Sequence, residues 1–165
     1  MKIIIFFFFL IFNLYSDLPK YLEGTWKSNR ELTMKYIDKE NKLDASQKSW
    51  ISQVVGRTEI TFSSSSNIVK CHTPKQQFLI SGNTINIPTH DFSLNYKILG
   101  VTEKQIAIEY ISNIEIEIET HFHIIEIIDK DTYSIYMGNY PPLSFPAREY
   151  FKRIKKISTK QLTKP

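Results

Sequence analysis

The sequence predicts a mainly β protein that folds as an antiparallel up-and-down β-barrel of about eight to ten strands. From Arg57 onward, short runs rich in β-branched and aromatic residues alternate with polar residues at period two. Turn-forming residues separate these runs, and no long helical pattern interrupts them. Evenly spaced runs of this kind are typical of sheets that close on themselves. We therefore expect successive strands to be joined by hairpins.

Ten runs are predicted to form strands, one before an early helical segment and nine after it. They span Tyr21–Lys27, Thr58–Phe62, Ile68–His72, Phe78–Ile80, Thr84–Ile87, Phe92–Leu99, Gln105–Tyr110, Ile114–Ile128, Thr132–Met137 and Arg148–Ile157. A turn is expected at residues 63–67, and Ser81-Gly82-Asn83 predicts a tight hairpin.

The early helical segment lies between the first and second predicted strands. Apolar residues recur at helical spacing in residues 30–37, and residues 44–55 carry one apolar stripe that ends at Gly56. Asp44 is followed three residues later by Gln47, which is the pattern of a capping box. We expect this helix or helix pair to pack on the barrel.

The N-terminus predicts export from the cytoplasm. Lys2 supplies a positive charge, and Ile3–Phe12 is an apolar run shorter than the roughly 20 residues of a membrane span. We expect cleavage after Ser16, which leaves a secreted or periplasmic protein with no membrane span; an uncleaved anchor is the alternative. The chain then divides into a signal peptide (1–16), a single barrel-like domain (17–157) and a polar basic tail (158–165).

Charge and cysteine content limit the function classes. The chain has 21 basic and 17 acidic residues, so loss of Lys2 with the signal peptide leaves a formal charge of +3. No concentrated basic face with interleaved aromatic residues is evident, so we expect no nucleic-acid partner. The single cysteine, Cys71, excludes an intramolecular disulfide, and we expect it to be a buried, inert thiol.

Two short motifs resemble those of calycin barrels. The G-T-W-K of residues 24–27 resembles the G-x-W opening of lipocalins and the G-T-W-K opening of fatty-acid-binding proteins. The R-E-Y of residues 148–150 is similar to the R-x-Y on the last strand of the fatty-acid-binding group. The resemblance implies that Trp26 closes the barrel floor and that Arg148 and Tyr150 bind a ligand carboxylate.

The lipocalin alternative assigns a different role to the last strand. There, a basic residue packs across the tryptophan, which would make Arg148 or Arg153 structural. In either case, an apolar interior accepts the ligand's tail and a few polar groups fix its head.

The most distinctive local pattern is E-I-E-I-E-T-H-F-H at residues 115–123. On a strand it places Glu119, His121 and His123 on one face and the alternating apolar residues on the other. The simplest interpretation is that the charged face meets water and the apolar face, including Phe122 and Ile124, meets the core. The alternative is a metal site, because His121 and His123 could share one zinc ion with Glu119, or a remote His72 or His90, as third ligand.

Catalytic motifs of the common kinds are absent from the sequence: there is no G-x-S-x-G, no glycine-rich phosphate loop and no H-E-x-x-H. We therefore expect an exported, non-catalytic barrel without a cofactor that binds a small apolar or amphiphilic ligand. The alternatives are the metal-binding domain and a structural or protein-interaction domain whose partner is unknown.

Overall fold

The structure is a computed structural model, and it describes residues 20–40, 42–80, 83–114, 117–136 and 147–155. For residues 80, 83, 111–114 and 117–120 only the backbone is described. The predicted signal peptide, the predicted tail and the central residues of the predicted 81–83 hairpin turn lie outside the described residues.

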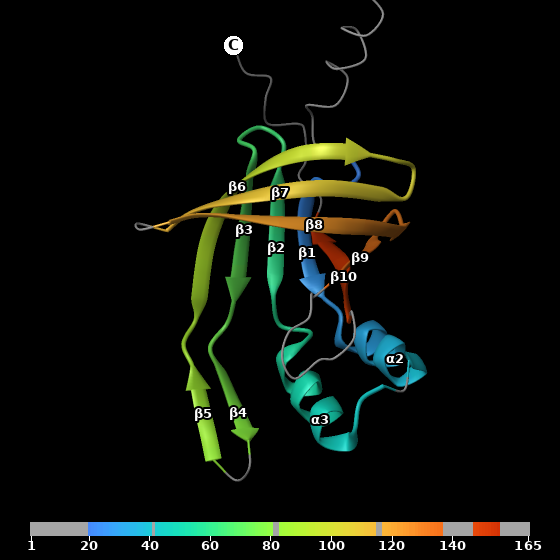
Figure 1. The fold of residues 1–165 in the computed structure, drawn as a ribbon, viewed down its shortest axis with the longest axis vertical. Helices are drawn as coiled ribbons and strands as arrows, with labels where there is room; N and C mark the ends of the chain where they lie inside the picture. The colour runs from blue at the N-terminus through green and yellow to red at the C-terminus, as the bar shows by residue number, and fades with distance from the viewer. Residues whose placement is uncertain (1–19, 41, 81–82, 115–116, 137–146, 156–165) are drawn as a thin grey trace, which may run out of the picture.

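Eight strands form a closed antiparallel barrel, as the alternating pattern predicts (Figure 1). Around the barrel their order is β1-β10-β9-β8-β7-β6-β3-β2, so nearly every strand pairs with its neighbour along the chain. Their bounds are β1 Gly24–Ser28, β2 Glu59–Ser63, β3 Ile68–Thr73, β6 His90–Val101, β7 Gln105–Ile114, β8 Glu117–Asp129, β9 Thr132–Tyr136 and β10 Arg148–Lys155. The mainly β, up-and-down architecture is therefore confirmed.

Two further strands, β4 (Gln76–Ile80) and β5 (Asn83–Ile87), form a separate hairpin that continues the β3–β6 pair beyond the barrel (Figure 1). The ladder breaks after the Thr73↔His90 pair and resumes at Gln76↔Ile87. A proline lies in each gap, at positions 74 and 88. Because proline has no backbone N–H, it interrupts a ladder and favours such a break.

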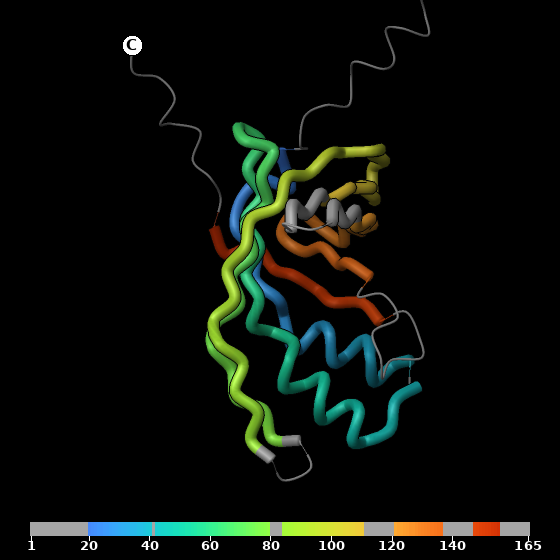
Figure 2. The backbone as a smooth tube through the Cα atoms, turned by 60° about the vertical axis from the view of Figure 1, so that its left-hand side comes forward, coloured from blue at the N-terminus to red at the C-terminus, as the bar shows by residue number. Residues whose placement is uncertain are grey.

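The predicted helical segment forms two helices, α2 (Arg30–Glu40) and α3 (Ala45–Val54), which lie together beside the β4–β5 hairpin (Figure 2). The capping box is present as predicted: the Asp44 side chain accepts from the Gln47 N–H at 2.8 Å, and the Gln47 side chain accepts from the Asp44 N–H at 3.1 Å. Gly56 follows α3 with φ +89°, and a Cβ there would lie 2.7 Å from Cβ of Arg30. None of the helices in the described ranges is long and apolar enough to cross a membrane.

The up-and-down path gives the barrel two different ends. The turns β2–β3, β6–β7 and β8–β9 lie at the end where β1 begins, which we call the floor end. The links from β1 to α2, from α3 to β2 and through the β4–β5 hairpin lie at the opposite end, which we call the helix end (Figure 1). The helices and the β4–β5 hairpin border the barrel at the helix end, so an opening between them and the barrel interior lies at that end.

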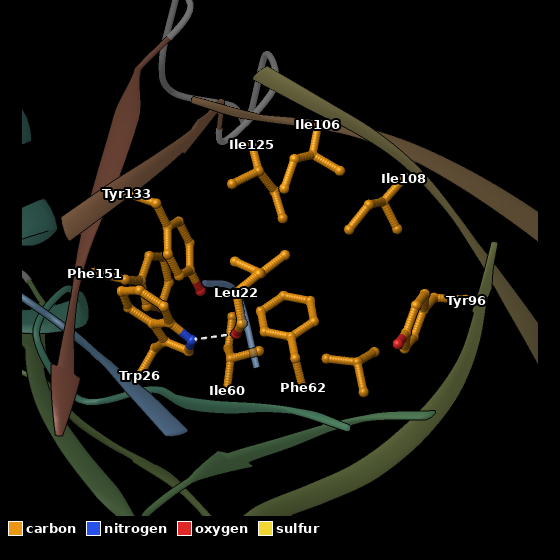
Figure 3. Close-up of a cluster of buried hydrophobic side chains, with 11 residues drawn as sticks. Leu22, Trp26, Ile60, Phe62, Tyr96, Ile106, Ile108, Ile125, Tyr133 and Phe151 are labelled. Carbon is orange, nitrogen blue, oxygen red and sulfur yellow. Dashed lines mark hydrogen bonds between the residues drawn. The ribbon is translucent and has the colours of Figure 1, made fainter. Parts of the chain in front are cut away.

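Large side chains fill the interior toward the floor end (Figure 3). The buried cluster consists of Leu22, Trp26, Ile60, Phe62, Val69, Tyr96, Ile106, Ile108, Ile125, Tyr133 and Phe151. Tyr133 is stacked on Phe151 with ring centroids 5.0 Å apart and meets Trp26 edge-on at 4.7 Å. Aromatic packing of this kind makes the floor end a dense core.

Packing becomes less complete toward the helix end on several strands. On β3, Val69 is buried and Cys71 is half-buried; on β9, Tyr133 is buried and Ile135 is half-buried. The inward-facing Phe92 of β6, which pairs with Cys71, is 38% exposed. The interior therefore changes from a filled core at the floor end to a partly accessible wall at the helix end.

Candidate functional site

Trp26 is buried in the core toward the floor end of the barrel. Its ring is 1% exposed, and its Nε1 donates a hydrogen bond to the backbone carbonyl of Leu22 at 2.7 Å. The preceding Gly24 has φ +129°, and a Cβ there would lie 2.5 Å from the carbonyl oxygen of Lys155. The glycine of the G-T-W motif is thus required for the close approach of β1 to β10.

Arg153 packs across Trp26 from the last strand. Its guanidinium carbon lies 4.0 Å from the Trp26 ring centroid, a cation–π contact. The guanidinium also donates to the backbone carbonyls of Glu23, at 2.5 Å, and of Tyr21, and its Nε lies 3.3 Å from the Asp131 carboxylate. This is the structural role that the lipocalin resemblance implies for a basic residue of the last strand.

Arg148 and Tyr150 lie on the outer face of β10. They alternate with Phe151, which points into the core, and Phe151 shares its face with Glu149. Arg148 forms an ion pair with Glu126 of β8 and stacks 4.3 Å over the Tyr136 ring. The structure thus brings the two predicted ligand residues together, on the side of the strand away from the core cluster.

Tyr150 faces α2 rather than the interior. Its ring lies 6.0 Å from that of Tyr36, and its backbone N–H donates to the Thr33 hydroxyl at 3.0 Å. Contacts of this kind attach α2 to the outside of the barrel. A carboxylate bound by Arg148 and Tyr150 would therefore lie under the helix, outside the barrel, and their ligand role stays a prediction.

The prediction for which face of β8 meets the core is wrong in the described part of the strand. Phe122 is 66% exposed and Ile124 is 47% exposed, whereas His123 is half-buried and shares its face with the buried Ile125. Ile125 and Ile127 both pack with the barrel core, which shows that the odd-numbered residues in this part of β8 face inward. The side chains of residues 114–120 lie outside the described part of the chain.

His121 and His123 lie on the inner face, and His123 packs edge-on against Tyr110 with ring centroids 5.2 Å apart. Burial, with a smaller effect of His121, lowers the pKa of His123, which favours the neutral imidazole that a metal requires. The side chain of Glu119 lies outside the described residues. Among the side chains that are described, no three His, Cys, Asp or Glu residues converge as metal ligands, so the metal site stays a prediction.

Four weakly acidic side chains face the barrel interior: Tyr133 of β9 within the floor-end core, and Cys71 of β3, Tyr110 of β7 and Glu149 of β10 nearer the helix end. Burial raises the pKa of the Cys71 thiol to about 11 and raises that of Tyr133 well above its usual value. The negative charges of Tyr110 and Glu149 further raise the pKa of Tyr133. The negative charge of Cys71 likewise raises the pKa of Tyr110. The four side chains thus act on one another electrostatically across the barrel interior. We call them the interior polar cluster.

Glu149 is the strongest acid of the interior polar cluster, and β1 holds it in place. The Ser28 hydroxyl donates to the Glu149 carboxylate, and the Gly56 N–H donates to the Ser28 oxygen at 2.7 Å. Burial raises the pKa of Glu149, and the hydrogen bond from Ser28 partly offsets this. The turn after α3 thereby orients a carboxylate inside the barrel.

The Tyr133 hydroxyl is buried without a hydrogen-bond partner among the described residues, and Tyr133 itself is 0% exposed. Its ring extends inward from β9 (Figure 3). Most buried hydroxyls in proteins are hydrogen-bonded, because an unpaired one costs about 1–3 kcal/mol. This atom is therefore the clearest unsatisfied group at the interior polar cluster.

Sequence reasoning missed Glu149, although it lies between the two predicted ligand residues. The signal that could have identified it is the alternation along β10: Phe151 is the apolar residue of that strand, and Glu149 is two residues away on the same face. Sequence reasoning also could not group Tyr110 with Tyr133, because they lie on strands that are not neighbours.

A shallow depression on the outer surface is a weaker site. It spans β2, β3 and β6 and is lined by Glu59, Lys70, His72 and Asp91, among others. Three of these four side chains already have partners: Lys27 Nζ lies 3.1 Å from Glu59, and His72 Nδ1 lies 2.5 Å from Asp91. Such exposed pairs contribute little and indicate a solvated surface.

Comparison with known proteins adds no family assignment: no family model, curated protein or solved structure matches this chain significantly. The class that the structure defines is a closed eight-stranded antiparallel barrel, an architecture consistent with a calycin-like barrel.

Proposed function

We propose that this protein is an exported, non-catalytic barrel that binds a small amphiphilic molecule in its interior, at the helix end. The accessibility of two inward-facing side chains carries this proposal. Glu149 and Tyr110 face the interior beyond the floor-end core, and both are half-buried rather than buried. Inward-facing side chains that keep accessible surface support a space in the barrel that a ligand would fill.

The wall around this space has the composition of a ligand site. Apolar side chains that are only partly buried, among them Leu94 and Ile135, pack against the core cluster and continue toward the helix end. Phe92 extends this apolar wall at the mouth and is 38% exposed. An apolar wall with a few convergent polar groups is typical of sites for small amphiphiles.

The single cysteine provides a direct test of interior binding. Cys71 faces inward on β3 and belongs to the interior polar cluster, so a molecule in this space would shield its thiol. We expect decanol, a neutral amphiphile, to slow alkylation of Cys71 by iodoacetamide at least severalfold in folded protein and to have no effect in urea. An unchanged rate up to the solubility limit of decanol would contradict the proposal.

Export is the second part of the proposal, and it rests on the apolar run at residues 3–12. Protein recovered from its host should lack the first 16 residues, which intact-mass measurement of the purified chain checks. Recovery of the uncleaved chain from the cell interior would contradict export without affecting the interior site.

A further inference from the structure

The interior polar cluster carries a charge preference that the predicted Arg148 and Tyr150 pair does not share. All four members are weak acids, so each is either neutral or negative. In the described strands, no lysine or arginine at the helix end faces inward; Arg153 does so only at the floor end, where Trp26 and backbone carbonyls occupy it. At the mouth, Arg57 packs 5.9 Å over Phe78 of the hairpin.

The other titratable side chains of this wall are His121 and His123 of β8. His123 faces inward beside Tyr110, and burial lowers its pKa. A ligand carboxylate would therefore meet Glu149 without a lysine or arginine to balance its charge, and like charges in a partly desolvated site repel strongly.

Hydrogen bonding points the same way. The Ser28 hydroxyl already donates to Glu149, and the Tyr133 hydroxyl has no partner among the described residues. A carboxylate with one fixed donor keeps lone pairs for further donors, and the Tyr133 oxygen can also accept. The cluster thus offers acceptors to a ligand that brings N–H groups.

We propose that the polar head of the ligand is a protonated amine that donates hydrogen bonds to the Glu149 carboxylate, with its apolar tail along Leu94 and Ile135. This rests on the proposed function, because it names the ligand class of the same interior site. It assigns the opposite charge to the ligand from the one that the R-x-Y resemblance implies.

A matched series of single-chain amphiphiles tests this. Decylamine, decanol and decanoate have the same tail and differ in the charge of the head, and their affinities at pH 7 are compared by calorimetry on the folded protein. We expect decylamine to bind at least about tenfold more tightly than decanoate, because a charged donor forms a stronger hydrogen bond to the Glu149 carboxylate and a ligand carboxylate is repelled by it. Decanol should bind with intermediate affinity.

Two variants test whether Glu149 is the source of the preference for decylamine. Glu149→Gln keeps an oxygen that can accept from Ser28 but removes the charge, so it should lower decylamine affinity about tenfold and decanol affinity by much less. Glu59→Gln, on the outer surface, is the matched control and should change neither affinity.

The outcomes separate the two proposals. If decanoate binds as tightly as decylamine, the amine inference is wrong while the interior site stands. If Glu149→Gln leaves the preference for decylamine intact, Glu149 is not its source and the inference is again wrong. If none of the three amphiphiles binds, both the interior site and the inference fail. The comparison on the unmodified protein decides the charge preference even if a variant does not fold.

Discussion

The guanidinium of Arg153 lies 4.0 Å from the ring centroid of Trp26, across the floor of the barrel. The arginine side chain links the last strand to the first, because it also donates to the backbone carbonyls of Glu23 and Tyr21, which precede β1. Since the two strands close the barrel at the β1–β10 pairing, this contact stabilises the closure itself.

Replacing Arg153 with methionine should therefore destabilise the fold strongly. The change removes the cation–π contact and leaves two carbonyls without their donor, so we expect the free energy of unfolding to fall by about 2–4 kcal/mol in urea titrations. Lys152→Met on the exposed face of the same strand is the control, with an expected change within about 0.5 kcal/mol. Equal effects of the two variants would show that the contact with Trp26 does not stabilise the barrel.

Two buried tyrosines should respond in opposite directions to loss of their hydroxyl. The Tyr96 hydroxyl donates to the Ser63 carbonyl at 3.0 Å, whereas that of Tyr133 has no partner in the described part of the chain. In ligand-free protein, Tyr96→Phe should lower the free energy of unfolding by about 1 kcal/mol and Tyr133→Phe should raise it by about the same amount. Chemical denaturation of both variants measures this, and a loss of stability in Tyr133→Phe would mean that its hydroxyl is satisfied after all.

The buried carboxyl of Glu149 should make stability depend on pH. Its pKa is raised in the folded protein from the ordinary value of 4.5, so the folded state holds its proton more tightly than the unfolded chain. Below about pH 4.5 Glu149 is protonated in both the folded and the unfolded state and does not lower the free energy of unfolding. That free energy falls as the pH rises from there through the raised pKa. Each unit by which folding raises the pKa corresponds to about 1.4 kcal/mol.

Glu149→Gln isolates this contribution, because the other titrating groups are common to both proteins. The variant should become more stable relative to the unmodified protein as the pH increases from 4 to 8, as measured by urea unfolding at each pH. A difference that does not change with pH would contradict a raised pKa at Glu149. Glu59→Gln, whose carboxylate is paired with Lys27 at the surface, should show no such trend.

Cys71 should alkylate slowly even without a ligand. Burial raises its pKa from 9.0 to about 11, which lowers the thiolate fraction at neutral pH about a hundredfold. The rate of iodoacetamide labelling should therefore still rise with pH above 9, whereas that of the urea-unfolded chain should level off. A rate that levels off near pH 9 in folded protein would show an ordinary, exposed thiol.

The regular parts of the fold could be predicted from the sequence because their signals are local. Period-two alternation indicated the strands, and Asp44 with Gln47 predicted the start of α3. The inward face of β8 could not be predicted, because Ile124 and Ile125 are adjacent apolar residues and either phase places one of them in the core. The core contacts of Ile125 decide between them.

The site depended on features that a sequence does not carry. The inward position of Glu149 follows from the burial of Phe151, and its hydrogen bond follows from the packing of β1 against β10. Cys71 and Tyr133 face the same interior only because the barrel closes, although they lie 62 positions apart in the chain. Gly24 and Trp26 of the G-T-W motif act through neighbours on adjacent strands.

Methyl chemical shifts during titration with decylamine test the interior site most directly. In protein labelled at isoleucine and leucine methyl groups, the inward-facing Leu94 and Ile135 should shift in proportion to bound ligand. The exposed methyl groups of Ile128 and Ile154, which are 49% and 52% exposed, should not move. Shifts confined to the exposed isoleucines, or no saturable shift at all, would show that the barrel interior does not bind the amphiphile.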